Sequence, residues 1–290
     1  MGHGDTQVQW QPKEIEAFAD QRVVAASAAW GHNLALTADG AVWSWGYADD
    51  GRLGHGPPFV DELLPKKIEA FVGQRVLAVS AGCDHSLALT ADGAVWSWGW
   101  GAWGRLGHGD ERRANLPKKV EALAGRRVVF VSAGDTHNLV ITADGAVWRW
   151  GTDLLVYDGN PSPGSILLLP NKVQAISDQR VVFASAGGEK SFALTAEGDV
   201  WSWGSGKDGQ LGHGDLQDAI LPKKITALEG RRVVAISAGA PSAGHNLALT
   251  ADGATLSWGR GRSGCLGHGE DLSDQPLPKQ IVALDLNRAP

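Results

Sequence analysis

Short runs of alternating apolar and polar residues cover most of this chain. The segment HSLALTA (85–91) alternates with a period of two, and AVWSWG (94–99) does so again. A period of two predicts β-strands rather than helices. The Asp92-Gly93 pair between the two runs predicts a tight hairpin, because glycine takes the positive φ angle that such a turn needs.

The same hairpin pattern returns five times along the chain. The first copy, ALTADGAVWSWG, covers residues 35–46, and its relatives start at residues 88, 140, 193 and 248. The second tryptophan of each copy recurs every 52 to 55 residues, at Trp45, Trp98, Trp150, Trp203 and Trp258. A fixed period of this length is typical of proteins built from repeated supersecondary units.

Each repeat contains two further apolar runs that we interpret as strands. An inner run such as RVLAVSAG (75–82) precedes the hairpin, and a proline-led run such as LPKKVEAL (116–123) follows a glycine-rich loop. Proline at the start of an outer strand removes no ladder hydrogen bond. No segment shows the i, i+3, i+4 apolar spacing of a helix. Repeated four-stranded units around an axis predict an all-β fold, a β-propeller of four-stranded antiparallel blades.

We expect a single propeller domain over residues 1–290, with five repeat units. Residues 1–20 contain GHGD (2–5) and PKEIEAF (12–18), which match only the loop and last strand of a preceding repeat. The approximate limits of the complete units are 21–73, 74–125, 126–178, 179–230 and 231–290.

The motifs VWSWG, GRLGHGD, LPKK and SAG-x-x-H recur together along nearly the whole chain. In this combination the sequence resembles the regulator-of-chromosome-condensation repeat family, which includes a Ran exchange factor and a plant UV-B photoreceptor. The resemblance implies a propeller, usually of seven blades, whereas five full units are present here. Three explanations stay open: a fragment of a longer propeller, a smaller ring that closes by pairing its ends, or closure by association with another copy.

Composition narrows the range of functions. The formal net charge is −6, which argues against direct nucleic-acid binding, because neutralising a phosphate backbone requires clustered excess Lys and Arg. Cys83 and Cys265 are isolated, so the sequence predicts neither a zinc site nor a disulfide framework. We find no signal peptide and no long apolar span. These features predict an intracellular protein, cytoplasmic or nuclear, that is not bound to a membrane.

Residues that suggest chemistry fall at repeated positions, where structural roles are expected. The nine histidines lie either in LGHG loops or at the start of the second strand, where we expect a ring nitrogen to bond turn backbone groups. The three Gly-x-Gly-x-x-Gly segments precede strands and not the helix that a dinucleotide needs. No nucleophile, base and orienting group form a set. The sequence therefore predicts no catalytic residues, no metal and no cofactor.

Positions that break the repeat are the candidate partner-binding sites. In the third unit, residues 152–170 replace a polar loop and carry Leu154, Leu155 and Tyr157. Exposed apolar residues on a loop of a rigid scaffold are a common binding device, although these leucines could instead fold back onto their blade. Further exceptions are the tryptophans Trp30, Trp100 and Trp103.

Three functions follow from the resemblance and the exceptions. The first is a scaffold that binds a protein partner. The candidate partners include a small GTPase and a chromatin-associated protein. The second is guanine-nucleotide exchange on a Ran-like GTPase, for which the resemblance would place face carboxylates at Asp84 and Asp135. The third is UV-B sensing. Relatives of that type carry a Gly-Trp-Arg-His-Thr motif on adjacent blades. Here only Trp30 stands at the tryptophan position, and the arginine is absent from all five units. We favour the scaffold, with exchange as the alternative.

Overall fold

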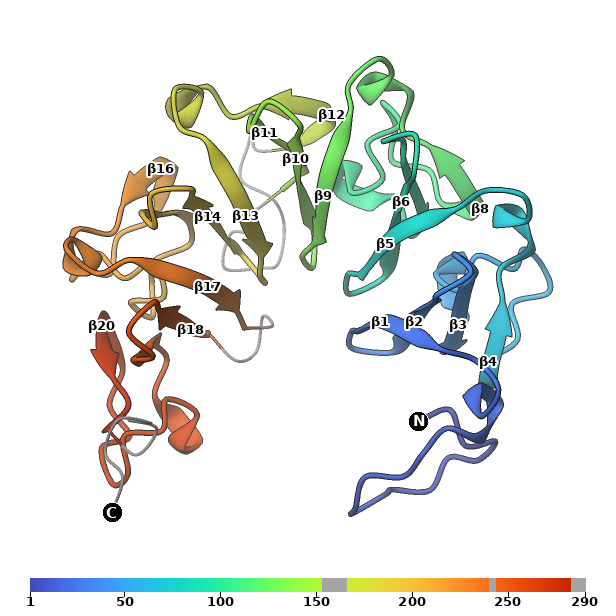
Figure 1. The fold of residues 1–290 in the computed structure, drawn as a ribbon, viewed down its shortest axis with the longest axis horizontal. Helices are drawn as coiled ribbons and strands as arrows, with labels where there is room; N and C mark the ends of the chain where they lie inside the picture. The colour runs from blue at the N-terminus through green and yellow to red at the C-terminus, as the bar shows by residue number, and fades with distance from the viewer. Residues whose placement is uncertain (153–165, 240–243, 283–290) are drawn as a thin grey trace.

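The computed structural model describes residues 1–152, 166–239 and 244–282. Five separate four-stranded antiparallel sheets lie side by side around an arc, which stays open between the first and the last sheet (Figure 1). Each sheet is one blade, and its strands are adjacent in the order of the sequence. The predicted all-β fold with four-stranded propeller blades is confirmed.

The strands of each blade run from the inside of the arc to its outside. Blade 1 contains β1 (Val23–Ala28), β2 (His32–Thr37), β3 (Val42–Gly46) and β4 (Glu62–Lys67). Blade 2 contains β5 (Val76–Ala81), β6 (His85–Thr90), β7 (Val95–Gly99) and β8 (Ala114–Lys119). Blade 3 contains β9 (Val128–Ala133), β10 (His137–Thr142), β11 (Val147–Gly151) and β12 (Leu167–Lys172). Blade 4 contains β13 (Val181–Ala186), β14 (Lys190–Thr195), β15 (Val200–Gly204) and β16 (Ala219–Lys224). Blade 5 contains β17 (Val233–Ala238), β18 (His245–Thr250), β19 (Thr255–Gly259) and β20 (Gln275–Gln280).

The helices in the described residues are single 3₁₀ turns at two repeated places. Three lie in the loop after a third strand: η2 (Asp49–Gly51), η4 (Ala102–Gly104) and η8 (Arg262–Gly264). Five lie before an inner strand: η1 (Glu16–Phe18), η3 (Glu69–Phe71), η5 (Glu121–Leu123), η6 (Gln174–Ile176) and η7 (Thr226–Leu228). None of the helices in the described part of the chain is long and apolar enough to cross a membrane.

The Thr-Ala-Asp-Gly hairpins form as the sequence predicts. In blade 2, the Thr90 hydroxyl donates to the Asp92 carboxylate at 2.6 Å, and the same carboxylate accepts the Ala94 N–H at 3.2 Å. Gly93 has a φ of +83°, and an added Cβ would lie 3.1 Å from the backbone of Arg127. The hairpin therefore needs glycine both for its turn and for its contact with the next blade.

The outer strands end earlier than expected. The run LPKKVEAL (116–123) was predicted to be one strand, but β8 ends at Lys119 and residues 121–123 form η5. The chain turns here because it must return from the outside of one blade to the inside of the next. Leu123 becomes buried in that turn, between blades. In blade 3, the outer strand also begins earlier than expected. Leu167 and Leu168 belong to β12 and not to the predicted loop 152–170.

The core lies between blades rather than within them. Leu34, Leu36 and Val42 of blade 1 pack against Ala88 and Trp98 of blade 2 in one cluster. The Trp98 indole Nε1–H also donates to the backbone oxygen of Arg52 at 2.9 Å. Trp150 and Trp258 repeat this bond with Arg105 and Gln210. Each tryptophan thus joins its own blade to the loop of the preceding one.

We expect Trp98→Phe to lower the free energy of unfolding by about 1 kcal/mol more than Trp203→Phe. Both indoles are buried, but the Trp203 N–H has no hydrogen-bond partner among the described residues, whereas the Trp98 N–H has one. Urea denaturation of the two variants measures the difference. Equal losses would show that the indole bond contributes nothing to the joint between blades.

The histidines join structural elements through side-chain partners, and His55, His108 and His213 also bond the backbone of a third-strand serine, so the expected backbone partners are confirmed for these three. Those that begin a second strand reach the neighbouring blade: Nε2 of His85 donates to Asn138 Oδ1 at 2.6 Å, and Nε2 of His32 lies 2.8 Å from Ser86 Oγ. Burial lowers the pKa of His32 and of His85 to about 3, so both rings are neutral. The LGHG histidines instead pair with a serine of their own third strand, as in His108 with Ser97 at 3.1 Å.

Residues 1–18 cover blade 1 in the way that a preceding blade would. Gly4 donates its N–H to the Leu63 oxygen at 3.1 Å, and Phe18 packs edge-on to Trp43. No strand forms in residues 1–18, although PKEIEAF (12–18) matches the last strand of a repeat. At the other end of the arc, the face of blade 5 is uncovered: Leu247 and Leu249 are 37% and 39% exposed, whereas their counterparts in the other blades are buried.

Candidate functional site

One end of every blade carries the loops that break the repeat. The turn from first to second strand and the loop from third to fourth strand both emerge there, because consecutive strands are antiparallel. We call this end the loop face. The opposite end carries the Thr-Ala-Asp-Gly hairpins and is called the hairpin face.

The loop face contains a hollow of about 680 Å³ on the inside of the arc. Its walls are mostly alanine and glycine from the ends of the five inner strands, and the remaining residues that line it are Trp30, Cys83, Asp84 and Asp135. Small residues are needed where the blades converge: a Cβ on Gly82 would lie 2.5 Å from the Gly134 oxygen of the next blade. The hollow thus combines an apolar wall with a few polar groups, as binding cavities do.

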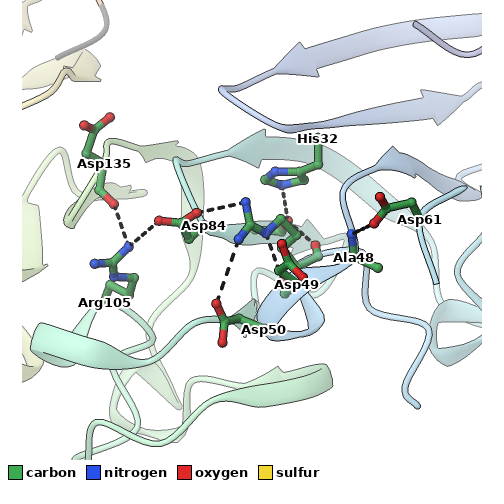
Figure 2. A network of polar contacts seen from close by, with 10 residues as sticks. His32, Ala48, Asp49, Asp50, Asp61, Asp84, Arg105 and Asp135 are labelled. Carbon is green, nitrogen blue, oxygen red and sulfur yellow. Dashed lines mark hydrogen bonds and ion pairs between the residues drawn. The ribbon is translucent and has the colours of Figure 1, made fainter. Parts of the chain in front are cut away.

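A chain of alternating charges borders the hollow. Arg52 Nη1 lies 2.8 Å from one Asp84 oxygen, and Arg105 Nη1 lies 3.5 Å from the other. Arg105 also donates to the backbone oxygen of Asp135 at 3.2 Å. Figure 2 shows Asp84 next to Arg105, while the Asp135 carboxylate points away from that arginine. Asp84 is therefore neutralised within the chain, and Asp135 has no direct ionic partner among the described residues.

Two tryptophans cover the buried guanidinium of Arg105. Its central carbon lies 4.4 Å from the Trp100 ring centre and 5.0 Å from the Trp103 ring centre, and its side chain is 1% exposed. Trp103 has a φ of +59°, which is rare and costly for a bulky residue. The strained backbone places the Trp103 ring against Arg105. Both indoles stay half-buried.

Burial changes the acidity of the groups in the hollow. It raises the pKa of the Asp135 carboxyl to about 7, against the opposing effect of Arg105. It also raises the pKa of the Cys83 thiol to about 12, and Asp84 adds to this shift. Cys83 is accordingly a protonated thiol and a poor nucleophile at neutral pH. These groups are suited to binding, and the described hollow offers no activated nucleophile.

Blade 4 departs from its siblings at Lys190. This residue takes the place of the histidine that begins the second strand, and its ammonium donates to the Gly239 oxygen at 3.0 Å. Burial lowers the pKa of Lys190 to about 8. The partner that a histidine would reach, Asn246 Oδ1, is buried and has no hydrogen bond with any residue that the structure describes. The replacement therefore leaves an unsatisfied atom between blades 4 and 5.

The structure brings five of the eight predicted site residues to the loop face. Trp30, Asp84 and Asp135 line the hollow, and Trp100 and Trp103 adjoin it through Arg105. The remaining three predicted residues lie outside the described part of the chain: Leu154, Leu155 and Tyr157. In the described ranges, no three His, Cys, Asp or Glu side chains are grouped as a metal site requires.

Sequence reasoning missed Arg52, Arg105 and Lys190. The two arginines were hidden in the repeated loop motif, although units four and five carry Gln210 and Cys265 at the same position. Lys190 was visible as the one exception to the histidine pattern. Comparing the repeats position by position, and not only their loops, would have singled out all three.

Comparison with known proteins identifies the family. A family model described as the RCC1-like domain matches residues 1–289. The chain belongs to the RCC1-like domain family. The resemblance predicted from the repeated motifs is therefore confirmed.

Several relatives share this RCC1-like repeat. The chain is 36% identical over 267 residues to the ultraviolet-B receptor UVR8 of Arabidopsis thaliana, covering 91% of the chain and 59% of UVR8. It is 37% identical to the human E3 ubiquitin-protein ligase HERC2, covering 98% of the chain but 6% of HERC2. The chain thus spans less than two thirds of the length of either relative.

Solved RCC1-like structures show the same architecture. Human WBSCR16 superposes with a TM-score of 0.79 at 30% identity, over 90% of this chain and 67% of that one. Prp20p of Saccharomyces cerevisiae superposes with a TM-score of 0.56 at 21% identity, over 89% of this chain and 76% of that one. At that identity, the Prp20p likeness concerns the fold alone.

Proposed function

We propose that this RCC1-like chain is a protein-interaction scaffold that binds its partner on the loop face. The observation that carries the proposal is the surface formed by Trp30, which is 81% exposed, and the pair Trp100 and Trp103 on Arg105. Tryptophan, tyrosine and arginine dominate binding energy at protein interfaces. Tyr47, half exposed and 6.5 Å from the Trp30 ring, extends the same surface.

The hollow gives this surface a concave region in which a partner segment could lie. It lies between Trp30 of blade 1 and Asp135 of blade 3, so a protruding partner segment would contact several blades at once. A rigid scaffold that presents anchors around a cavity loses little conformational entropy on binding. RCC1-like propellers are largely non-catalytic, which agrees with a binding role.

The test is quantitative affinity capture from the source cells with the double variant Trp30→Ser and Trp103→Asn. Asparagine tolerates the positive φ of residue 103, so the backbone is expected to stay in place. We expect the variant to recover at most about a tenth of the partner held by the unaltered chain. The matched control is Trp10→Ala, since Trp10 is 92% exposed but lies in the segment that covers blade 1. Equal recovery by the double variant would contradict the proposal.

Guanine-nucleotide exchange on a Ran-like GTPase is the alternative. In its favour, the solved Prp20p structure is described together with that protein's binding to Gsp1p and histones. Against it, one of the two candidate carboxylates, Asp84, is already paired with arginine in this chain. Release of labelled GDP from a Ran-like GTPase, with and without the chain, distinguishes exchange from simple binding.

UV-B perception has two observations in its favour. The chain is 36% identical to UVR8, and its Trp100 and Trp103 rings lie 5.6 Å apart on a buried arginine. A change in tryptophan fluorescence or molecular mass after ultraviolet-B irradiation would support this role. The scaffold proposal expects neither change.

A further inference from the structure

The hairpin face carries one arginine per blade, directly before the innermost strand. We call this set the arginine arc; it consists of Arg22, Arg75, Arg127, Arg180 and Arg232. The inner strands β1, β5, β9, β13 and β17 line the inside of the blade arc (Figure 1). The five arginines therefore surround the central opening at the face opposite the hollow. All five are exposed.

Backbone contacts hold each arginine in the same place. The backbone oxygen of Arg127 accepts the Ala143 N–H at 2.8 Å, and that of Arg180 accepts the Ala196 N–H at 2.9 Å. The side-chain stems rest on hairpin glycines: a Cβ on Gly93 would lie 3.1 Å from Arg127 Cγ. The stems are thus fixed by the blades, while the guanidinium groups extend into solvent.

The charges of the arginine arc are not compensated within the described chain. None of its guanidinium groups forms an ion pair or a side-chain hydrogen bond with a described residue. The nearby hairpin aspartates stay ionised, but the cations that act on them are outer-strand lysines. Lys224 lies 2.9 Å from Asp199. The Thr90 hydroxyl lowers the pKa of Asp92, and Lys119 adds to this shift. Like charges that gather without counter-charges create a positive potential that attracts anions.

This potential is reinforced between blades 2 and 3. Two grooves, of about 280 and 310 Å³, flank the Gly125–Arg127 turn. Arg126 lies 4.3 Å above the Trp148 ring and donates to the Ala122 oxygen at 3.1 Å, so its guanidinium is held in a fixed orientation. Lys119 and Asp92 line one groove, and Lys172 and Asp144 line the other. With Arg126 and Arg127 in both, three cations face one carboxylate in each groove.

We propose that the arginine arc binds an acidic peptide segment of a partner protein, anchored at Arg126 and Arg127. A carboxylate can accept two parallel N–H bonds from one guanidinium, and successive carboxylates would reach successive blades. A peptide fits better than a nucleic acid, because the chain has a net charge of −6 and the one aromatic ring in the grooves, Trp148, is covered by Arg126. This second surface is independent of the loop face.

The experiment measures fluorescence anisotropy with a labelled peptide of alternating glutamate and glycine. We expect binding that weakens at least about tenfold between roughly 0.05 and 0.3 M salt, because the contacts are ionic and exposed. The triple variant Arg75→Gln, Arg127→Gln and Arg180→Gln should weaken binding at least about tenfold. The charge-keeping triple variant to lysine should retain most of the affinity, and it keeps the test valid if the glutamine variant unfolds.

A matched control removes the same charge elsewhere. Lys66→Gln, Lys118→Gln and Lys223→Gln together remove three cations from the outer strands, and we expect less than about a twofold loss. An equal loss in this control would overturn the proposal in favour of general charge attraction. Equal binding of a glutamine–glycine peptide, or tighter binding of an oligothymidylate, would overturn it as well. The proposal that a partner binds the loop face does not depend on any of these outcomes, because its own test is affinity capture.

Discussion

Arg105→Ala is expected to lower the free energy of unfolding by about 3 kcal/mol. The substitution removes a buried guanidinium that pairs with Asp84 and donates to the Asp135 backbone oxygen. It also leaves a space between Trp100 and Trp103, whose rings now pack on that group. Urea denaturation, followed by tryptophan fluorescence, measures the loss.

The control for this prediction is Arg113→Ala. Arg113 also pairs with a carboxylate, Asp50 at 3.9 Å, and lies over the Phe59 ring at 5.7 Å, but its side chain is 55% exposed. We expect a loss below about 1 kcal/mol, because water screens exposed pairs. If the two variants were equally stable, the buried charge chain would not be holding the loop face together.

Lys190→His is expected to raise the free energy of unfolding by about 1–2 kcal/mol. The imidazole would reach Asn246 Oδ1, as His85 reaches Asn138, and would satisfy a buried oxygen that has no partner in the described part of the chain. It would also remove a buried ammonium, whose lowered pKa reflects the cost of its burial. Thermal and urea denaturation at pH 7 test the change.

A double variant isolates the cause of this gain. With Asn246→Ala present, Lys190→His has no acceptor to reach, so we expect the gain to disappear. A gain of the same size in both backgrounds would mean that removing the ammonium, and not satisfying Asn246, stabilises the protein. No gain in either background would contradict the prediction altogether.

The fold was predictable because its determinants are local and repeated. The Thr-Ala-Asp-Gly hairpin around Asp92 depends on residues within five positions of one another, and the sequence shows all of them. The end of the outer strand was not predictable in the same way. Residues 121–123 leave the sheet to bury Leu123 between blades, which depends on tertiary packing.

The candidate site was predictable only as a list of exceptions. Trp30, Asp84 and Asp135 break the repeat, and the structure brings them to one hollow. The role of Arg105 depends on residues from blades 2 and 3 together, and its loop motif looks like that of the other units. A repeated sequence marks where the copies differ, but it does not show which differences meet in space.

The stacking of the blades determines which part of the protein unfolds most readily. Among the described residues, blades 2, 3 and 4 are each packed on both sides, whereas Leu247 and Leu249 of blade 5 are partly exposed and residues 1–18 cover blade 1. In such a linear array, stability is a sum of contacts between neighbours, so the outermost members detach at the lowest cost. Amide exchange should accordingly be slowest at the centre of the array and quicken toward its two ends.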